Sequence, residues 1–111
     1  MTNGSTLKRP DGELSSAQKR HLKSLAHHLD PKVRMGRAGA SASVVSETAR
    51  TIDAHELIKV RIDLDGARER RDAAGRLADQ VGAHLVGTIG KIAILYRANE
   101  EKPRIKLPGA K

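Results

Sequence analysis

Apolar residues in this chain switch along its length between the spacing of a helix and the alternation of a strand. The first helical stripe consists of Leu22, Leu25, Ala26 and Leu29. Polar and apolar residues then alternate over 32–35 and again over 57–62, as they do in half-buried strands. Strands that are separated by helices usually pair within one sheet, so this order predicts an α/β fold.

The first helix is expected over residues 16–29. Ser15 and Gln18 form a capping-box pattern at its start, in which each side chain binds the backbone N–H of the other residue. Pro31 pushes the residue before it out of the helical conformation, so the helix should end by Leu29.

Two further helices and a hairpin complete the pattern. Ser41 can cap a second helix, and Gly82 suits the end of a third. Strands are expected at 84–89 and 92–97, with a tight turn at Gly90 between them. The predicted fold class is therefore α/β, in the order α-βαβαββ, as a two-layer or three-layer sandwich with a four-stranded mixed sheet.

The pattern predicts one folded domain over residues 14–98, between a flexible lead-in at 1–13 and a basic tail at 99–111. The first residues lack the apolar run of a signal peptide, and no stretch is apolar enough to span a membrane. The chain has no cysteine, which excludes disulfides and thiolate metal sites. We therefore expect a soluble, cytoplasmic protein without a membrane partner.

Positive charge is concentrated in the first part of the expected domain. The formal net charge is +8, and residues 15–37 hold six Lys or Arg against Asp30 alone. Such a surplus within a folded segment favours a polyanionic partner, nucleic acid first. Tyr96 is the only aromatic residue, so the sequence does not predict a sheet that stacks bases. Binding should depend mainly on charge and backbone amides.

A Gly-x-x-Gly loop, Gly36-Arg37-Ala38-Gly39, lies between a predicted strand and a predicted helix start. Glycines allow the backbone to turn tightly and to approach a ligand closely. The helix start adds unpaired N–H groups, and Arg37 adds a guanidinium that matches phosphate. KH domains hold a nucleic-acid backbone with such a loop. The simpler interpretation, a connection without a ligand, is less favoured because of this placement.

The first helix supplies a second cationic element. One flank, away from the apolar stripe, carries Ser16, Lys19, Arg20, Lys23 and His27. This flank has no acidic residue, whereas an ordinary solvated helix face mixes both signs. We therefore expect Lys19, Arg20 and Lys23 to bind RNA together with the four loop residues. For this the loop and the flank would have to lie side by side and hold one phosphate chain.

Metal and catalytic sites are not predicted. The adjacent His27 and His28 point to different helix faces, and His55-Glu56 lacks the second histidine of a His-Glu-x-x-His site. The sequence has no nucleophile elbow, and no Lys-Ser or Lys-Thr pair completes a P-loop at Gly39. We expect a protein that is not an enzyme and that uses no cofactor or metal.

Several short segments, in order, resemble the CRM domain family and in particular its stand-alone bacterial YhbY-like members. These segments are Leu22-Lys23-Ser24-Leu25-Ala26-His27, Gly36-Arg37-Ala38-Gly39, His55-Glu56-Leu57-Ile58-Lys59-Val60, Ile89-Gly90-Lys91 and Leu95-Tyr96-Arg97. The resemblance covers residue 14 to about residue 107.

The resemblance implies a fold similar to the C-terminal domain of bacterial translation initiation factor three. It also implies RNA binding, since bacterial members are associated with precursors of the large ribosomal subunit and plant relatives take part in group II intron splicing. We therefore expect a monomeric assembly factor that contacts large-subunit rRNA. Two alternatives stay open: a protein-interaction module on the ribosome or a translation factor, and a protein that binds double-stranded DNA.

Overall fold

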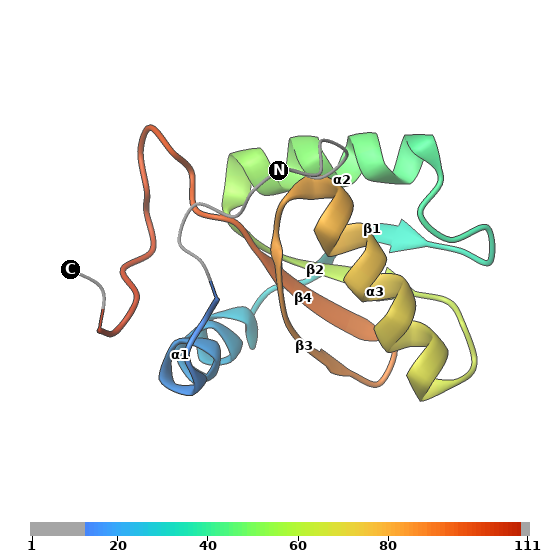
Figure 1. The fold of residues 1–111 in the computed structure, drawn as a ribbon, viewed down its shortest axis with the longest axis horizontal. Coiled ribbons are helices and arrows are strands. Elements are labelled where there is room, and N and C mark those ends of the chain that lie inside the picture. The colour runs from blue at the N-terminus through green and yellow to red at the C-terminus, as the bar shows by residue number, and fades with distance from the viewer. Residues whose placement is uncertain (1–12, 110–111) are drawn as a thin grey trace, which may run out of the picture.

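The four strands of this fold form one mixed sheet with two helices on one face and one on the other (Figure 1). The computed structural model describes residues 13–109. Its elements in order are α1 (Ser16–Ala26), β1 (Pro31–Met35), α2 (Ala42–His55), β2 (Leu57–Ile62), α3 (Ala67–Val81), β3 (His84–Ile89) and β4 (Ile92–Tyr96). The predicted order α-βαβαββ and the mixed sheet are confirmed.

The strands lie in the order β1-β2-β4-β3. β1 and β2 are parallel, because α2 carries the chain back between them, and the other two pairs are antiparallel. α2 and α3 cover one face of the sheet and α1 covers part of the other, so the three-layer form of the prediction is the one observed.

β2 shows how the two faces divide. Ile58, Val60 and Ile62 are buried under α2 and α3, in the larger of two apolar clusters. Leu57 points to the opposite face, where it joins a smaller cluster below α1. Residues two apart in a strand share a face, so the side chains at 59 and 61 lie on the α1 side as well. That side therefore carries apolar residues below α1 and basic residues at 59 and 61.

α1 is shorter than predicted. The Ser15–Gln18 capping box is present, with N–H donors 2.9 and 3.1 Å from their side-chain acceptors. The helix ends at Ala26 instead of Leu29, because the N–H groups of His27 and Leu29 each bind a carbonyl only three residues back. Leu25, expected in the buried stripe, is 40% exposed, and α1 is held instead by the fully buried Leu22 and Ala26.

The predicted caps of the other two helices are confirmed. The Ser41 hydroxyl accepts a hydrogen bond from the N–H of Val44 at the start of α2. Gly82 ends α3 with a left-handed φ of 67°, a conformation that glycine adopts without strain. α3 begins after Gly66, whose N–H donates to the Glu69 carboxylate over 3.1 Å.

Glu56, between α2 and β2, ties the C-terminal segment to the domain. Its side chain is fully buried, and its φ of 65° turns the chain from the helix into the strand. The carboxylate accepts hydrogen bonds from three backbone N–H groups, those of Asn99 at 2.6 Å, Arg104 at 2.9 Å and Ile105 at 3.0 Å. Both oxygens of the buried carboxylate therefore have hydrogen-bond partners.

The segment after β4 also packs against the smaller cluster. Ile105 and Leu107 lie against it, and the Pro108 carbonyl accepts a hydrogen bond from the Gln18 side chain. Residues 99–109 of the predicted tail are therefore in contact with the folded chain. The division at residue 98 stays a prediction, and residues 1–12, 110 and 111 of the predicted end segments lie outside the described residues.

Replacing Glu56 with Ala should unfold the protein more easily and release the segment that it holds. Three partly buried N–H groups would lose their acceptor, which should lower the free energy of unfolding by roughly 3 kcal/mol. Glu56→Gln should cost less, because its amide keeps one acceptor oxygen. Urea denaturation measures the loss, and hydrogen exchange at Arg104 and Ile105 reports the release. Unchanged exchange at both amides in Glu56→Ala would contradict this role.

Candidate nucleic-acid interface

The Gly36–Gly39 loop is a hydrogen-bonded turn with open space around it. The N–H of Gly39 donates to the Gly36 carbonyl over 3.0 Å, and the N–H of Ser41 donates to the Gly39 carbonyl over 2.9 Å. Gly39 has a φ of +76°, which strains any residue with a side chain. A Cβ added at Gly36 or Gly39 would meet no atom within 4 Å. The backbone is therefore fixed in shape and accessible to a ligand.

The start of α2 faces out next to this turn. Ser41 caps the N–H of Val44, while the N–H groups of Ala42 and Ser43 have no acceptor within residues 13–109. The first turn of a helix carries partial positive charge, so these groups suit an anion. Arg37 is exposed and has no acidic partner in the described part of the chain. A phosphate could therefore meet both backbone and side-chain donors here.

The cationic flank of α1 is exposed as predicted and reaches the sheet through one residue. Lys19, Arg20 and Lys23 are all solvent-exposed. The Lys23 side chain extends over Gly87 of β3, where an added Cβ would lie 2.8 Å from its Cε atom. The absence of a side chain at Gly87 thus makes room for Lys23 on the sheet.

The loop and the α1 flank do not lie side by side, and that expectation is wrong. α1 precedes the start of β1 and the loop follows its end, so the two occupy opposite ends of the molecule (Figure 1). β1, a five-residue strand at roughly 3.3 Å per residue, spans about 16 Å of the distance between them. The seven predicted residues therefore do not form one site that holds a phosphate chain from adjacent positions.

An uncovered end of the sheet lies between them, which we call the open sheet end. The strand register places Lys59 in one row with Ile94 and with Gly87, the glycine over which Lys23 extends. The next row runs Arg34, Arg61, Ile92, Ile89. The open sheet end consists of Arg34, Lys59, Arg61, Ile89 and Ile92. Ile89 is 64% exposed, because no helix covers this row.

Sequence reasoning missed the open sheet end, although a signal was present. Lys59 and Arg61 occupy the alternate positions of the clearest strand, and Arg34 does the same in its parallel neighbour. Basic residues at period two on one face predict a cationic sheet surface. That surface joins the α1 flank to the loop, so cations span the distance between the two predicted elements.

Asp63 holds two of these cations in position. Its carboxylate accepts a hydrogen bond from Arg34 Nε and, over 2.9 Å, from Arg61 Nε. The hydrogen bond from Arg34, followed by that from Arg61, keeps the pKa of Asp63 below its usual value despite partial desolvation. Asp63 therefore stays ionised at neutral pH and orients the two guanidiniums across neighbouring strands.

Most of the chain matches a known protein family. The model of the CRS1/YhbY (CRM) domain matches residues 14–97. The chain belongs to this family. The matched region contains α1, the Gly36–Gly39 loop and the open sheet end, so all three surfaces are parts of the CRM domain.

Two relatives of this CRM domain match it over nearly their whole length. A probable RNA-binding protein of Bacillus subtilis, YqeI, is 36% identical over 95 residues, which cover 86% of this chain and 99% of the relative. An RNA-binding protein of Haemophilus influenzae is 39% identical over 95 residues, which cover 86% and 95%.

A solved structure shares the fold of the CRM domain. The solution structure of a hypothetical protein from Staphylococcus aureus superposes with a TM-score of 0.79 at 32% sequence identity, covering 86% of this chain and all of that one. Within residues 13–109, no helix has the length and apolarity that a membrane crossing requires. No cluster of three or more His, Asp or Glu residues in the same range could hold a metal ion.

The two loop glycines of the CRM domain should respond differently to the same added methyl group. Gly39→Ala should lower the free energy of unfolding by roughly 1–2 kcal/mol, because φ is positive there. Gly36→Ala should leave it nearly unchanged, because that site is open and its φ is not positive. Chemical denaturation of both variants measures the difference, and equal losses would contradict the described turn.

Proposed function

We propose that this CRM domain binds structured RNA by its backbone and acts as an assembly factor for the large ribosomal subunit. One observation carries the proposal. The α1 flank, the open sheet end and the Gly36–Gly39 loop follow one another along the molecule and carry exposed cations, the half-buried Lys59 and free backbone donors. Phosphates neutralise such a surface, and the counterions released on binding supply much of the free energy.

The run is extended, so the partner should be extended too. Lys23 and Lys59 would meet phosphates near α1, and the forks of Arg34 and Arg61 would meet phosphates further along. Arg37 and the N–H groups at the start of α2 would meet the backbone beyond the sheet. The spacing suits a folded RNA whose phosphates are held at fixed separations, which is recognition by shape.

The chain offers little for reading bases over this surface. Tyr96 is buried below α1, and the apolar residues of the open sheet end, Ile89 and Ile92, have no aromatic ring to stack on a base. The affinity that this surface contributes should therefore vary little with sequence and strongly with salt. The names of the relatives support RNA as the partner, and the association with large-subunit precursors that the resemblance to YhbY-like proteins implies supports rRNA.

Crosslinking in cells followed by sequencing of the bound RNA tests the proposal. Large-subunit rRNA precursors should be recovered, and ribonuclease treatment should release the protein from its complexes. Gly36→Asp should reduce recovery severalfold, since it places a carboxylate beside phosphate in open space without a strained φ. Gln80→Glu adds the same charge on the exposed side of α3 and serves as the control.

Complexes that survive ribonuclease would instead favour a protein-interaction module and would contradict the proposal. Recovery of other RNA classes with no enrichment of large-subunit precursors would retain RNA binding but contradict the assembly role.

A further inference from the structure

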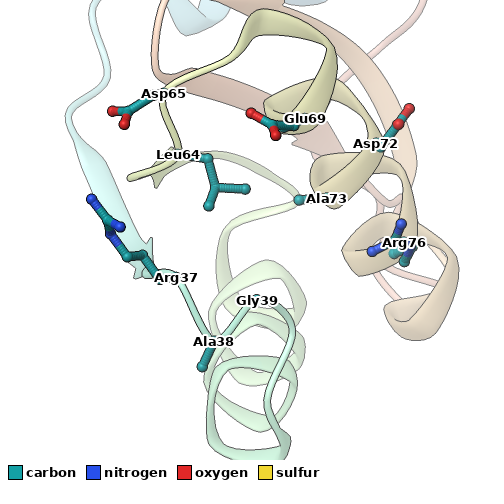
Figure 2. A pocket seen from close by; sticks show the side chains of 9 residues that line it. All are labelled: Arg37, Ala38, Gly39, Leu64, Asp65, Glu69, Asp72, Ala73 and Arg76. Carbon is teal, nitrogen blue, oxygen red and sulfur yellow. The ribbon is translucent and has the colours of Figure 1, made fainter.

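A cleft opens on the other side of the Gly36–Gly39 loop, between the loop and α3 (Figure 2). Its volume is about 530 Å³, within the roughly 300–1,000 Å³ typical of sites for small organic ligands. The residues around it are Arg37, Ala38, Gly39, Leu64, Asp65, Glu69, Asp72, Ala73 and Arg76. The proposed RNA surface does not use this cleft, although both share the loop.

The centre of the cleft is apolar. Leu64 and Ala73 point toward one another across it, and Ala38 lies on the loop side (Figure 2). Leu64 and Ala73 belong to the packing around the larger cluster, so this surface is held in place. A flat, uncharged ring could lie against such a surface and gain from burial.

The polar groups of the cleft carry both signs of charge. Asp65, Glu69 and Asp72 contribute three carboxylates, and Arg37 and Arg76 contribute two guanidiniums. These charges nearly cancel, so the cleft lacks the positive surplus that would attract a phosphate into it. The cleft differs in chemistry from the cationic surface and suits a neutral group that donates hydrogen bonds.

Glu69 is the acceptor best placed for such a group. Its side chain points over Leu64 toward the interior of the cleft, whereas Asp72 points away from it (Figure 2). One oxygen of Glu69, Oε1, accepts the N–H of Gly66, which fixes the carboxylate. A carboxylate has about four lone-pair positions, so acceptor capacity remains for a ligand.

We propose that the cleft receives one unpaired base of the bound RNA and selects for bases that carry an exocyclic amino group. This inference rests on the proposed function, because the base reaches the cleft while its phosphate stays on the loop and Arg37. Cytosine, adenine and guanine present an exocyclic amino donor to Glu69, whereas the only donor at the same edge of uracil is N3–H, which lies between two carbonyl oxygens that a carboxylate repels. Unpaired bases are the usual points at which proteins read RNA sequence.

The choice of a base over a metal ion follows from the same residues. The carboxylates of the cleft are spread over the β2–α3 connection and two turns of α3, and they form no metal-binding cluster within the described residues. An apolar surface between the carboxylates also suits a ring better than a hydrated cation.

Binding of nonamer RNA tests the selection directly. We would compare U9 with the same oligonucleotide carrying a single central cytosine, by fluorescence anisotropy at low salt. The wild-type protein should bind the cytosine form about five- to tenfold more tightly. Glu69→Gln should abolish or invert this preference, because its carbonyl keeps the cap on Gly66 and turns the NH₂ donor toward the cleft.

Glu100→Gln is the matched control, since Glu100 is exposed and lies on the segment after β4, away from the cleft. It removes the same charge and should keep the wild-type preference. Equal wild-type affinity for both oligonucleotides, or a preference that survives in Glu69→Gln, would overturn the inference and leave the proposed function intact.

Two further outcomes separate the possibilities. If the wild-type protein binds neither the oligonucleotides nor structured RNA, the proposed function is contradicted, and the inference fails with it. The second outcome comes from a titration with cytidine monophosphate alone. If the nucleotide saturates the protein at concentrations similar to those that the oligonucleotide needs, the cleft is a site for free nucleotides. That result would contradict selection of a base within RNA.

Discussion

Leu22 and Ala26 pack α1 against one part of the sheet. The position of the helix determines which part of that face stays exposed to a ligand. The helix has three turns and packs over β3, β4 and the start of β2. Beyond its end the same face carries Lys59, Arg61 and Arg34 in place of Leu57 and Tyr96. A helix that covered these residues would have to bury Lys59 and the Arg34 and Arg61 pair bound to Asp63, which would be costly. The short helix and the cationic strand residues therefore depend on each other.

Parallel pairing of β1 with β2 imposes a second constraint. It requires a crossover, and the crossover begins with the Gly36–Gly39 loop and continues into α2 on the opposite face. The loop thus lies at the boundary between the two faces of the sheet. One side of it meets the open sheet end and the other meets the cleft with Glu69, so a single nucleotide could place its phosphate and its base in different environments.

Local patterns in the sequence were sufficient for the order of elements and for their caps. The caps at Ser15, Ser41 and Gly82 involve residues only a few positions away in the sequence. The alternation of residue types in 57–62 reflects burial of one face of the strand. Contacts between distant segments could not be predicted in this way. One example is the hydrogen bond from the Ile105 N–H to Glu56, and another is the burial of Leu22 instead of Leu25. Both depend on tertiary packing between segments that are far apart in the sequence.

The candidate site was predicted in its residue types but not in its geometry. The loop and the α1 flank are close in sequence, and this closeness suggested contact, yet an extended strand between them carries the chain away. Lys59 and Arg61 come later in the chain, but they lie on the surface between the loop and the α1 flank, because β2 pairs between β1 and β4. Which of these residues bind RNA stays a proposal.

The salt dependence of RNA binding tests most directly whether RNA crosses the open sheet end. The double variant Lys59→Ala/Arg61→Ala should make the slope of log affinity against log salt less steep by about 1.5 units. Arg68→Ala/Arg71→Ala removes the same charge from exposed positions of α3, on the opposite face, and should leave the slope unchanged. Equal changes in both variants, or a larger change in the α3 variant, would contradict the account.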